Sequence, residues 1–285
     1  MEESIALDEL SSTTKNLFFS KSDLGSTGGS KLQGGLRTQG YYKKSIKNKP
    51  LFSIITVCFN AEATIERTIQ SVLGQSWDNI EYIIIDGGSD DGTRDVLLKY
   101  SDQIDYWISE PDEGLYDAMN KGITFSTGDY CGILNADDWY HPGSLEKVAK
   151  LTDRADIIFG DLIFVKDHQE VRYRAKLESI NTRMKIWHPA CFIRRALHLE
   201  VLYDTRFKSS ADWDLLLALY SRGCSFIKID EVLTYMSHGG MTSDSKGFLL
   251  RAREDLIIQK KYGLKSAGVR YILRIIKHYA LFWDR

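Results

Sequence analysis

The order of apolar runs along the chain is the feature that most restricts its fold. Between residues 52 and 140, short runs rich in β-branched residues alternate with segments whose apolar residues recur every three or four positions. The first pattern is typical of buried strands and the second of helices. The predicted strands lie at 52–60, 80–86, 104–110 and 130–140, and the predicted helices at 65–73, 93–100 and 114–128. This alternation predicts an α/β fold, with βαβ units and a mainly parallel central sheet flanked by helices.

The second half of the chain is less regular. The elements expected there are a strand with a hairpin, a short strand with a helix, a helix, a strand, a flexible loop and a terminal helix, at 155–176, 187–202, 210–223, 225–236, 237–247 and from Phe248. Residues 1–48 are rich in Ser, Thr and Gly, which predicts an irregular N-terminal arm. We therefore expect one folded domain at 49–247 and a C-terminal helical extension at 248–285.

Composition argues against several classes of protein. The 285 residues carry a formal net charge of −2, which gives no sign of nucleic-acid binding. The four cysteines form no CxxC pair, so free thiols in a reducing compartment are favoured over disulfides or a zinc site. The first residues do not resemble a secretory signal, and no apolar stretch reaches the roughly 18 residues of a membrane span. A cytoplasmic protein is expected.

Polar side chains gather where the predicted strands end. In open α/β sheets, ligands bind outside the carboxyl ends of the strands. Those ends carry Asn60, Asp86, Glu110, Asn135, Asp137 and Asp138. An ionised carboxylate is costly to bury unless it is paired or bound to a metal, and hard cations such as Mg²⁺ and Mn²⁺ prefer oxygen ligands. The adjacent Asp137 and Asp138 therefore indicate either a cation site or a solvated turn in which the carboxylates cap the next segment.

The order of four motifs decides between these alternatives. FSIITVCFN, IIIDGGSDDGT, DAMNKG and LNADDWYHP occur in this order. Together they resemble family-2 glycosyltransferases of the GT-A fold, over residues 36–245. The closer resemblance is to bacterial enzymes that build capsule, O-antigen or colanic-acid-type polysaccharides, and GGLRTQGYYKKS ahead of the core is similar to that group. The family's DxD motif appears here as Asn135-Ala136-Asp137, followed by Asp138, with Asn in place of the first Asp.

The resemblance implies a reaction and its cofactor. A family member moves a sugar from a nucleotide-diphosphate donor, most commonly a UDP-sugar, to a hydroxyl of a growing or lipid-linked glycan, with inversion. Mn²⁺ or Mg²⁺ would be held by Asp137, together with Asp138, and by His238 near the diphosphate. Asn135 and Ala136 would contact the donor. ADWD is similar to the family's ADYD, so Asp212 is expected to be the general base. Asp214, two positions on, has the weaker claim.

Other motif positions are expected to bind the nucleotide, each beside a plainer alternative. The backbone near Thr56 would meet the base, although its side chain suits a core strand. Asn60 and Glu62 would contact the nucleotide, or Asn60 could cap a helix. Asp86 would accept hydrogen bonds from the base or ribose. Many family members have a second Asp after this one, where this chain has Gly87.

The third strand and the helix after it would line the donor cleft. Glu110, Asn120 and the pair Asp117 and Lys121 lie there, although Asp117 and Lys121 at i and i+4 could equally form a surface ion pair. His188, in WHPACFIRR, resembles the acceptor-side segment of the family, or it is a structural histidine.

The C-terminal segment and two rival functions stay open. Apolar residues recur through 269–283 with basic residues between them. That pattern suits a helix lying on an anionic membrane, at the inner face of the plasma membrane, or a helix packed on protein. A sugar nucleotidylyltransferase would also use such a sheet, but would be expected to carry a basic, Gly-rich loop where this chain has TVCFNAEATIE. A non-catalytic relative that binds glycan or nucleotide is the second rival.

Overall fold

The structure is a computed structural model that describes residues 31–167, 169–237 and 245–264. His238, the amphipathic pattern at 269–283 and the arm at 1–30 lie outside the described residues. Within these ranges, no helix has both the length and the apolar character needed to cross a bilayer.

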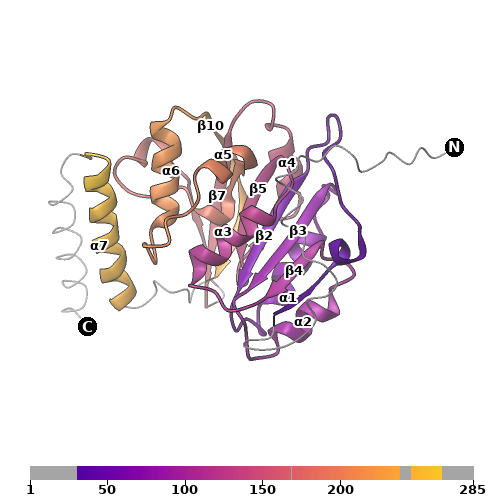
Figure 1. The fold of residues 1–285 in the computed structure, drawn as a ribbon. Helices are drawn as coiled ribbons and strands as arrows, with labels where there is room; N and C mark the ends of the chain where they lie inside the picture. The colour runs from indigo at the N-terminus through magenta and orange to yellow at the C-terminus, as the bar shows by residue number, and fades with distance from the viewer. Residues whose placement is uncertain (1–30, 168, 238–244, 265–285) are drawn as a thin grey trace. The chain divides into compact units, whose positions relative to one another are not determined.

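Four parallel strands form the centre of the sheet (Figure 1). They lie in the order β4-β3-β2-β5, with β2 at Phe52–Cys58, β3 at Ile80–Asp86, β4 at Tyr106–Ser109 and β5 at Tyr130–Asn135. Every residue of β2 and β3 is buried, as expected for strands covered on both faces. The predicted helices between them are α1 (Ile65–Leu73), α2 (Thr93–Lys99) and α3 (Leu115–Phe125). The predicted α/β fold with a largely parallel sheet is confirmed.

Alternate side chains of the central strands enter two separate cores. Ile55 and Val57 of β2 pack with α3 and with α6 (Ala211–Ser221), whereas Phe52 and Ile54 pack with α1 and α2. This is the period of two that a strand imposes on its side chains. A Cβ atom at Gly122 of α3 would lie 2.3 Å from Ile55, so the glycine allows the close approach of helix and sheet.

Strand direction changes beyond β5. The 3₁₀ helix η4 (His188–Ala190) leads into β9 (Cys191–Arg194), which pairs antiparallel with both β5 and β7 (Ile157–Lys166). β10 (Phe226–Ser237) runs parallel to β7, and the two-residue β6 (Trp139–Tyr140) pairs antiparallel with β10. β8 (Gln169–Tyr173) forms the predicted hairpin with β7. The remaining helices are α4 (Ser144–Ala149), α5 (Arg195–Glu200) and α7 (Ser245–Lys261).

Part of the arm that was expected to be irregular at 1–48 forms regular structure. β1 (Leu32–Gly34) pairs antiparallel with β4 and extends the sheet, and the 3₁₀ helix η2 (Leu36–Gln39) follows it. A Cβ atom at Gly34 would lie 2.6 Å from the Trp107 ring. Gly35 has a φ of +102°, which favours glycine. Glycines that suggested an irregular segment are therefore required by a close contact and a sharp turn.

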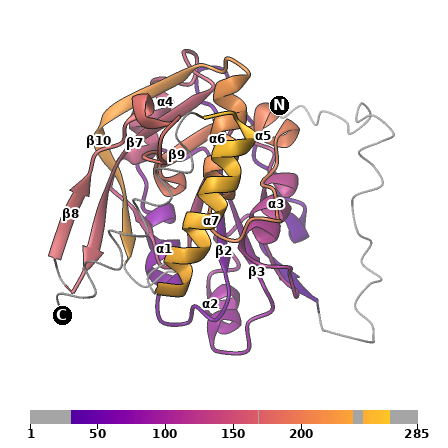
Figure 2. The same ribbon diagram turned by 90° about the vertical axis from the view of Figure 1, so that its left-hand side faces the viewer.

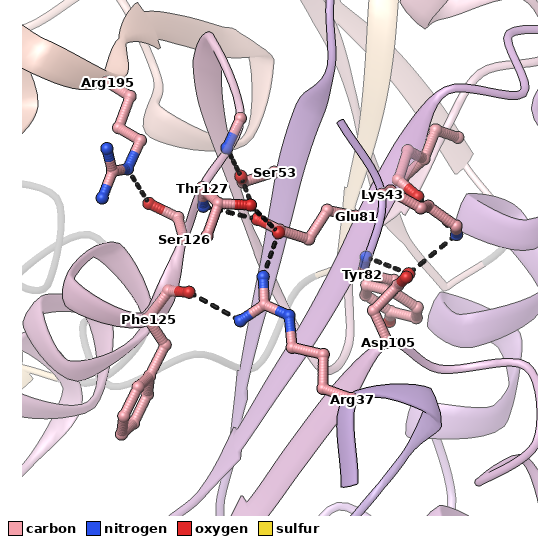
Figure 3. A network of polar contacts seen from close by, with 12 residues as sticks. Arg37, Lys43, Ser53, Glu81, Tyr82, Asp105, Phe125, Ser126, Thr127 and Arg195 are labelled. Atoms are coloured by element: carbon pink, nitrogen blue, oxygen red, sulfur yellow. Dashed lines mark hydrogen bonds and ion pairs between the residues drawn. The ribbon is translucent and has the colours of Figure 1, made fainter. Parts of the chain in front are cut away.

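A buried carboxylate fastens this segment to the sheet (Figure 3). Glu81 on β3 is 1% exposed. Its donors are the Arg37 guanidinium, the Ser53 hydroxyl and both the backbone N–H and the hydroxyl of Thr127. Nearby, Lys43 Nζ lies 2.9 Å from Asp105 Oδ2. The basic residues ahead of the core thus neutralise carboxylates on the sheet.

Replacing Arg37 with Met should destabilise the protein, because Glu81 would remain as a buried charge without its cation. We expect the free energy of unfolding in urea to fall by about 3–5 kcal/mol. Lys49 and Asp78 form a matched control pair at 2.6 Å whose side chains are 40% and 74% exposed. Lys49→Met should cost less than about 1 kcal/mol. Equal losses in the two variants would show that Arg37 does not hold Glu81.

Candidate active site

Two loops at the carboxyl ends of β2 and β3 are bonded to each other. Asn60 N–H donates to Ser89 Oγ at 2.8 Å, and Asn60 Oδ1 accepts from Asp90 N–H at 3.0 Å. Glu62 Oε2 accepts from Gly92 N–H at 3.1 Å. Asn60 and Glu62 are exposed at this edge, where the sequence placed them. The loops therefore form a fixed rim, and contact of these two residues with a nucleotide stays a prediction.

Two predicted nucleotide contacts lie inside the protein instead. Thr56 is completely buried, with its hydroxyl 3.0 Å from Tyr82 OH, because it belongs to a strand covered on both faces. Asp86 is also completely buried and accepts hydrogen bonds from Ser89 N–H at 3.0 Å and Ser109 Oγ at 2.6 Å. The Thr56 side chain thus belongs to a core strand, the alternative that the sequence left open, and contact of Asp86 with a nucleotide stays a prediction. Asp86 holds the loop after β3 in place.

Asp138 holds the turn after β5 from inside. It is 1% exposed, and its two oxygens accept hydrogen bonds from Ser237 N–H at 3.0 Å and Asn135 Nδ2 at 3.2 Å. The Thr68 hydroxyl lies 2.9 Å and 2.7 Å from the carbonyl oxygens of Ala136 and Asp138. Burial raises the pKa of Asp138 well above its usual range, and neighbouring Asp137 raises it further. Direct binding of a cation by Asp138 is not supported, and Ala136, 6% exposed, can offer a ligand only its backbone.

Asp137 is the carboxylate that the turn presents. Its backbone carbonyl accepts hydrogen bonds from Arg67 Nη2 at 2.8 Å and Ser237 Oγ at 2.7 Å, and no other described residue donates to its carboxylate. Burial raises the pKa of Asp137, whereas the charge of Arg67 lowers it. The Arg67 guanidinium itself lies 3.7 Å above the Trp139 ring. A half-buried anion with little hydrogen bonding thus lies beside a fixed cation.

The donor set at this turn fits a hard cation with one protein carboxylate. Among the described residues, no three His, Cys, Asp or Glu side chains are grouped so that they could hold a metal ion. Mg²⁺ in nucleotide sites commonly takes one or two carboxylates and fills its other positions with phosphate and water. Asp137 meets that requirement. The second predicted ligand, His238, lies outside the described residues, directly after Ser237, which is bonded to the turn.

The residues expected to line the donor cleft form a polar group at the start of α3. Lys121 Nζ lies 3.3 Å from Asp117 Oδ2 and 3.4 Å from Glu110 Oε1, and all three side chains are about one quarter exposed. Asn120 exchanges two hydrogen bonds of 2.9 Å with the backbone of Tyr203. The ion pair named as the alternative for Asp117 and Lys121 is present. Their contact with a donor stays a prediction.

Asp212 lies in the first turn of α6, next to η4. Its Oδ1 accepts a hydrogen bond from Trp213 N–H at 2.9 Å and lies 3.5 Å from Tyr116 OH. Its Oδ2 lies 3.6 Å from His188 Nδ1, and the two side chains are 13% and 16% exposed. Burial raises the pKa of Tyr116 well above its usual range, and the charge of Asp212 adds to this. The carboxylate predicted as general base is therefore partly exposed and only loosely bonded to other elements.

Asp214 is occupied by a second helix. Lys261 on α7 lies 2.7 Å and 2.8 Å from its two oxygens, and Figure 2 shows α7 running beside α6. Glu254 of α7 accepts hydrogen bonds from the backbone N–H groups of residues 208–210, just before α6. α7 therefore fixes the start of α6, and Asp214 has a structural partner, as its weaker claim implied.

Three residues around the site had no signal in the sequence. Arg67 and Thr68 lie within α1, and Tyr116 lies in α3. The contacts of these residues with the turn and with Asp212 span 68 to 96 positions of the chain. Only the folded arrangement of α1, α3 and β5 brings them to the site.

Comparison with known proteins agrees with this arrangement. Residues 53–208 match the model of glycosyl transferase family 2. A PGL/p-HBAD biosynthesis glycosyltransferase of Mycobacterium bovis is 29% identical over 214 residues, covering 71% of this chain and 84% of the relative. The narrower resemblance to capsule, O-antigen and colanic-acid enzymes is loose.

Two solved structures are similar in fold. TarS from S. aureus, in complex with UDP-GlcNAc, aligns with a TM-score of 0.59 and 19% identity over 72% of this chain and 66% of TarS. The mannosyltransferase PcManGT from Pyrobaculum calidifontis, in complex with GDP-Man and Mn²⁺, aligns with a TM-score of 0.57 and 17% identity over 75% of this chain and 64% of PcManGT. The alignment thus spans just under two thirds of each of these proteins. Both similarities support the GT-A fold.

Alanine at the two adjacent carboxylates should separate their roles. Asp138→Ala removes the acceptor of two partly buried donors, Ser237 N–H and Asn135 Nδ2, and each lost hydrogen bond costs about 0.5–1.5 kcal/mol. Asp137→Ala removes no hydrogen bond from another described residue, so its unfolding free energy should stay within about 0.5 kcal/mol of wild type. Urea denaturation without added metal measures both. If Asp137→Ala is the more damaging change, the turn is not held from inside by Asp138.

Proposed function

The chain belongs to glycosyl transferase family 2 and is a glycosyltransferase, and from this premise we propose that it transfers a sugar, with inversion, from a nucleoside diphosphate donor to a hydroxyl of a growing glycan. A UDP-sugar is the preferred donor, as in the TarS complex, with a GDP-sugar as in PcManGT the second choice. The acceptor is a glycan, free or lipid-linked.

The positions of two available carboxylates carry the proposal. Asp137 follows β5, against which η4 with His188 packs, and Asp212 lies 3.6 Å from the His188 ring. An inverting transfer needs one group that serves the leaving diphosphate and another that takes the proton of the attacking hydroxyl. Asp137 at the end of β5 and Asp212 at the start of α6 supply such a pair around one imidazole.

Asp137 is the residue that would hold a divalent cation. When bound, Mn²⁺ or Mg²⁺ would neutralise negative charge on the diphosphate leaving group. The protein's part is to keep the Asp137 carboxylate in one place, and Arg67 and Ser237 do so through its backbone carbonyl. The rim residues Asn60 and Glu62, with Asp117 and Lys121, are the proposed contacts for the rest of the donor.

Asp212 is the proposed general base. The acceptor oxygen attacks the anomeric carbon from the face opposite the diphosphate, and its proton passes to Asp212 as the new bond forms. The hydrogen bond from Trp213 N–H holds the carboxylate at the first turn of α6, and the Tyr116 hydroxyl lies 3.5 Å from the same oxygen. A carboxylate oxygen has room for a further donor, which the acceptor hydroxyl provides.

A screen of UDP-Glc, UDP-Gal, UDP-GlcNAc and GDP-Man tests the donor class and the metal together. Calorimetry with and without Mn²⁺ should detect binding of at least one nucleotide sugar that weakens when the metal is removed. Asp137→Asn should weaken this metal-dependent binding by about tenfold or more, because the cation loses its anionic protein ligand. Donor binding that is unaffected by Mn²⁺ and by Asp137→Asn would contradict this assignment.

Replacing Asp212 with Asn should leave donor binding near wild type and reduce transfer. General bases contribute about 10²- to 10⁴-fold to rates, so the transfer rate at saturating donor should fall by this factor. Release of nucleoside diphosphate reports the rate, with p-nitrophenyl glycosides as acceptors and the rate in water alone subtracted. Asp214→Asn is the matched control, since its partner is Lys261. Full transfer by Asp212→Asn would leave the base unidentified.

A further inference from the structure

His188 is held rigidly at the point where the sheet changes direction. It opens η4, which packs against β5 beside the turn that carries Asp137. The next residue, Pro189, has its carbonyl bonded to the buried hydroxyl of Thr234 on β10 at 2.6 Å. The backbone that carries the imidazole is therefore anchored to β5 and, through Pro189, to β10. A side chain that places another group accurately needs such an anchored backbone.

The ring uses one nitrogen toward Asp212. His188 Nδ1 lies 3.6 Å from Asp212 Oδ2, and both side chains are more than four fifths buried. The other oxygen, Oδ1, has Trp213 N–H as its one close donor. Among the described residues, Nδ1 of His188 is the only Lys, Arg or His nitrogen paired with Oδ2, and a small movement of either side chain would bring the two atoms within hydrogen-bond distance.

The other nitrogen has no partner in the described part of the chain. His188 Nε2 is buried, and no described atom forms a hydrogen bond with it. The ring borders a small cavity of about 10 Å³, which Asp212, Tyr203, His198 and apolar side chains of β5, β9 and α6 also line. A space of this size holds about one water molecule. If Nε2 is the acceptor nitrogen, one water can satisfy it, and Nδ1 then carries the hydrogen.

We propose that His188 is a positioning residue for the base: its Nδ1–H donates to Asp212 Oδ2 and orients the carboxylate toward the acceptor hydroxyl. The proposal rests on the proposed function, because it assigns a task within proton transfer. In the transfer step the acceptor O–H bond breaks and its proton moves to Asp212, while the oxygen forms its bond to the anomeric carbon. The bond from that carbon to the diphosphate oxygen breaks, and the nucleoside diphosphate leaves with the electron pair. His188 keeps its own proton throughout.

Two substitutions distinguish this task from simple packing. In Asn the amide nitrogen is attached to Cγ, as Nδ1 is in histidine, whereas in Gln it lies one bond further out, nearer to the place of Nε2. His188→Asn should therefore keep a donor for Asp212 and retain transfer within about tenfold of wild type. His188→Gln should lose about 10²-fold or more in kcat, with little change in donor affinity. His141→Asn serves as a control for the replacement itself, since the His141 ring stacks on Tyr235 instead.

The assay uses the donor that binds in the screen above, with p-nitrophenyl glycosides as acceptors. Combined with Asp212→Asn, His188→Gln should add little further loss, because residues that act through one another are not additive. Equal transfer by the Asn and Gln variants at position 188 would overturn the proposal, as would fully additive losses. Loss of donor binding in His188→Gln would place His188 in the donor site instead. If Asp212→Asn is inactive while His188→Gln is fully active, the base stands and the positioning role falls.

A spectroscopic measurement tests the proposal without any substrate. Long-range ¹H–¹⁵N NMR spectra distinguish a ring nitrogen that carries hydrogen from one that does not, and His188→Gln identifies the signals of this ring. We expect Nδ1 to carry hydrogen in the wild type, and the Nδ1 signal to shift in Asp212→Ala. A wild-type ring with hydrogen on Nε2 only would overturn the proposal even if the protein is a transferase. Unchanged Nδ1 signals in Asp212→Ala would do the same.

Discussion

The geometry of the site depends on one buried carboxylate, Asp138. A carboxylate with 1% exposure is unfavourable unless its oxygens find donors, and here Ser237 N–H and Asn135 Nδ2 provide them. These donors come from β10 and from the end of β5, so meeting the needs of Asp138 joins two distant strands at the turn. The side chain of the preceding residue, Asp137, is only half-buried, and no other described residue donates to its carboxylate.

The change of strand direction after β5 brings His188 to this turn. In a purely parallel sheet, the next strand would bring a helix N-terminus to the same edge. Here β9 runs antiparallel to β5, so it is the start of β9, preceded by η4, that lies beside the end of β5. This places His188 near both Asp137 and the first turn of α6. α7 then secures α6 through Lys261 and Asp214.

Sequence reasoning reached the fold more fully than the site. Strands and helices at 52–140 were predictable because strand and helix periodicities differ and each run is bounded by polar residues. The role of residues 31–48 was missed, because Gly34 and Gly35 resemble a flexible segment until Trp107 and the turn at Gly35 are seen. Within the site, the enclosure of Asp86 by Ser89 and Ser109 was not predictable, because a motif gives a position in the chain and not the direction of a side chain. Arg67 carries no local signal at all, since its contact with Asp137 spans 70 positions.

Carboxylates with a structural role have several close hydrogen-bond donors, whereas those free to bind a ligand have few. Only the folded structure shows how many donors surround each carboxylate. Glu81 has four donors from Arg37, Ser53 and Thr127. Asp86 and Asp138 are likewise enclosed by neighbouring N–H and O–H groups. Such carboxylates stabilise the fold because their hydrogen bonds offset desolvation, and they have little capacity left for a ligand.

Asp137 has no donor from another described residue, and Asp212 has one close donor and two looser neighbours. The unsatisfied oxygens on these two groups are what a cation and an acceptor hydroxyl would satisfy. Incomplete hydrogen bonding therefore distinguishes Asp137 and Asp212 from the enclosed carboxylates, whereas acidity, which many other Asp and Glu residues of the chain share, does not.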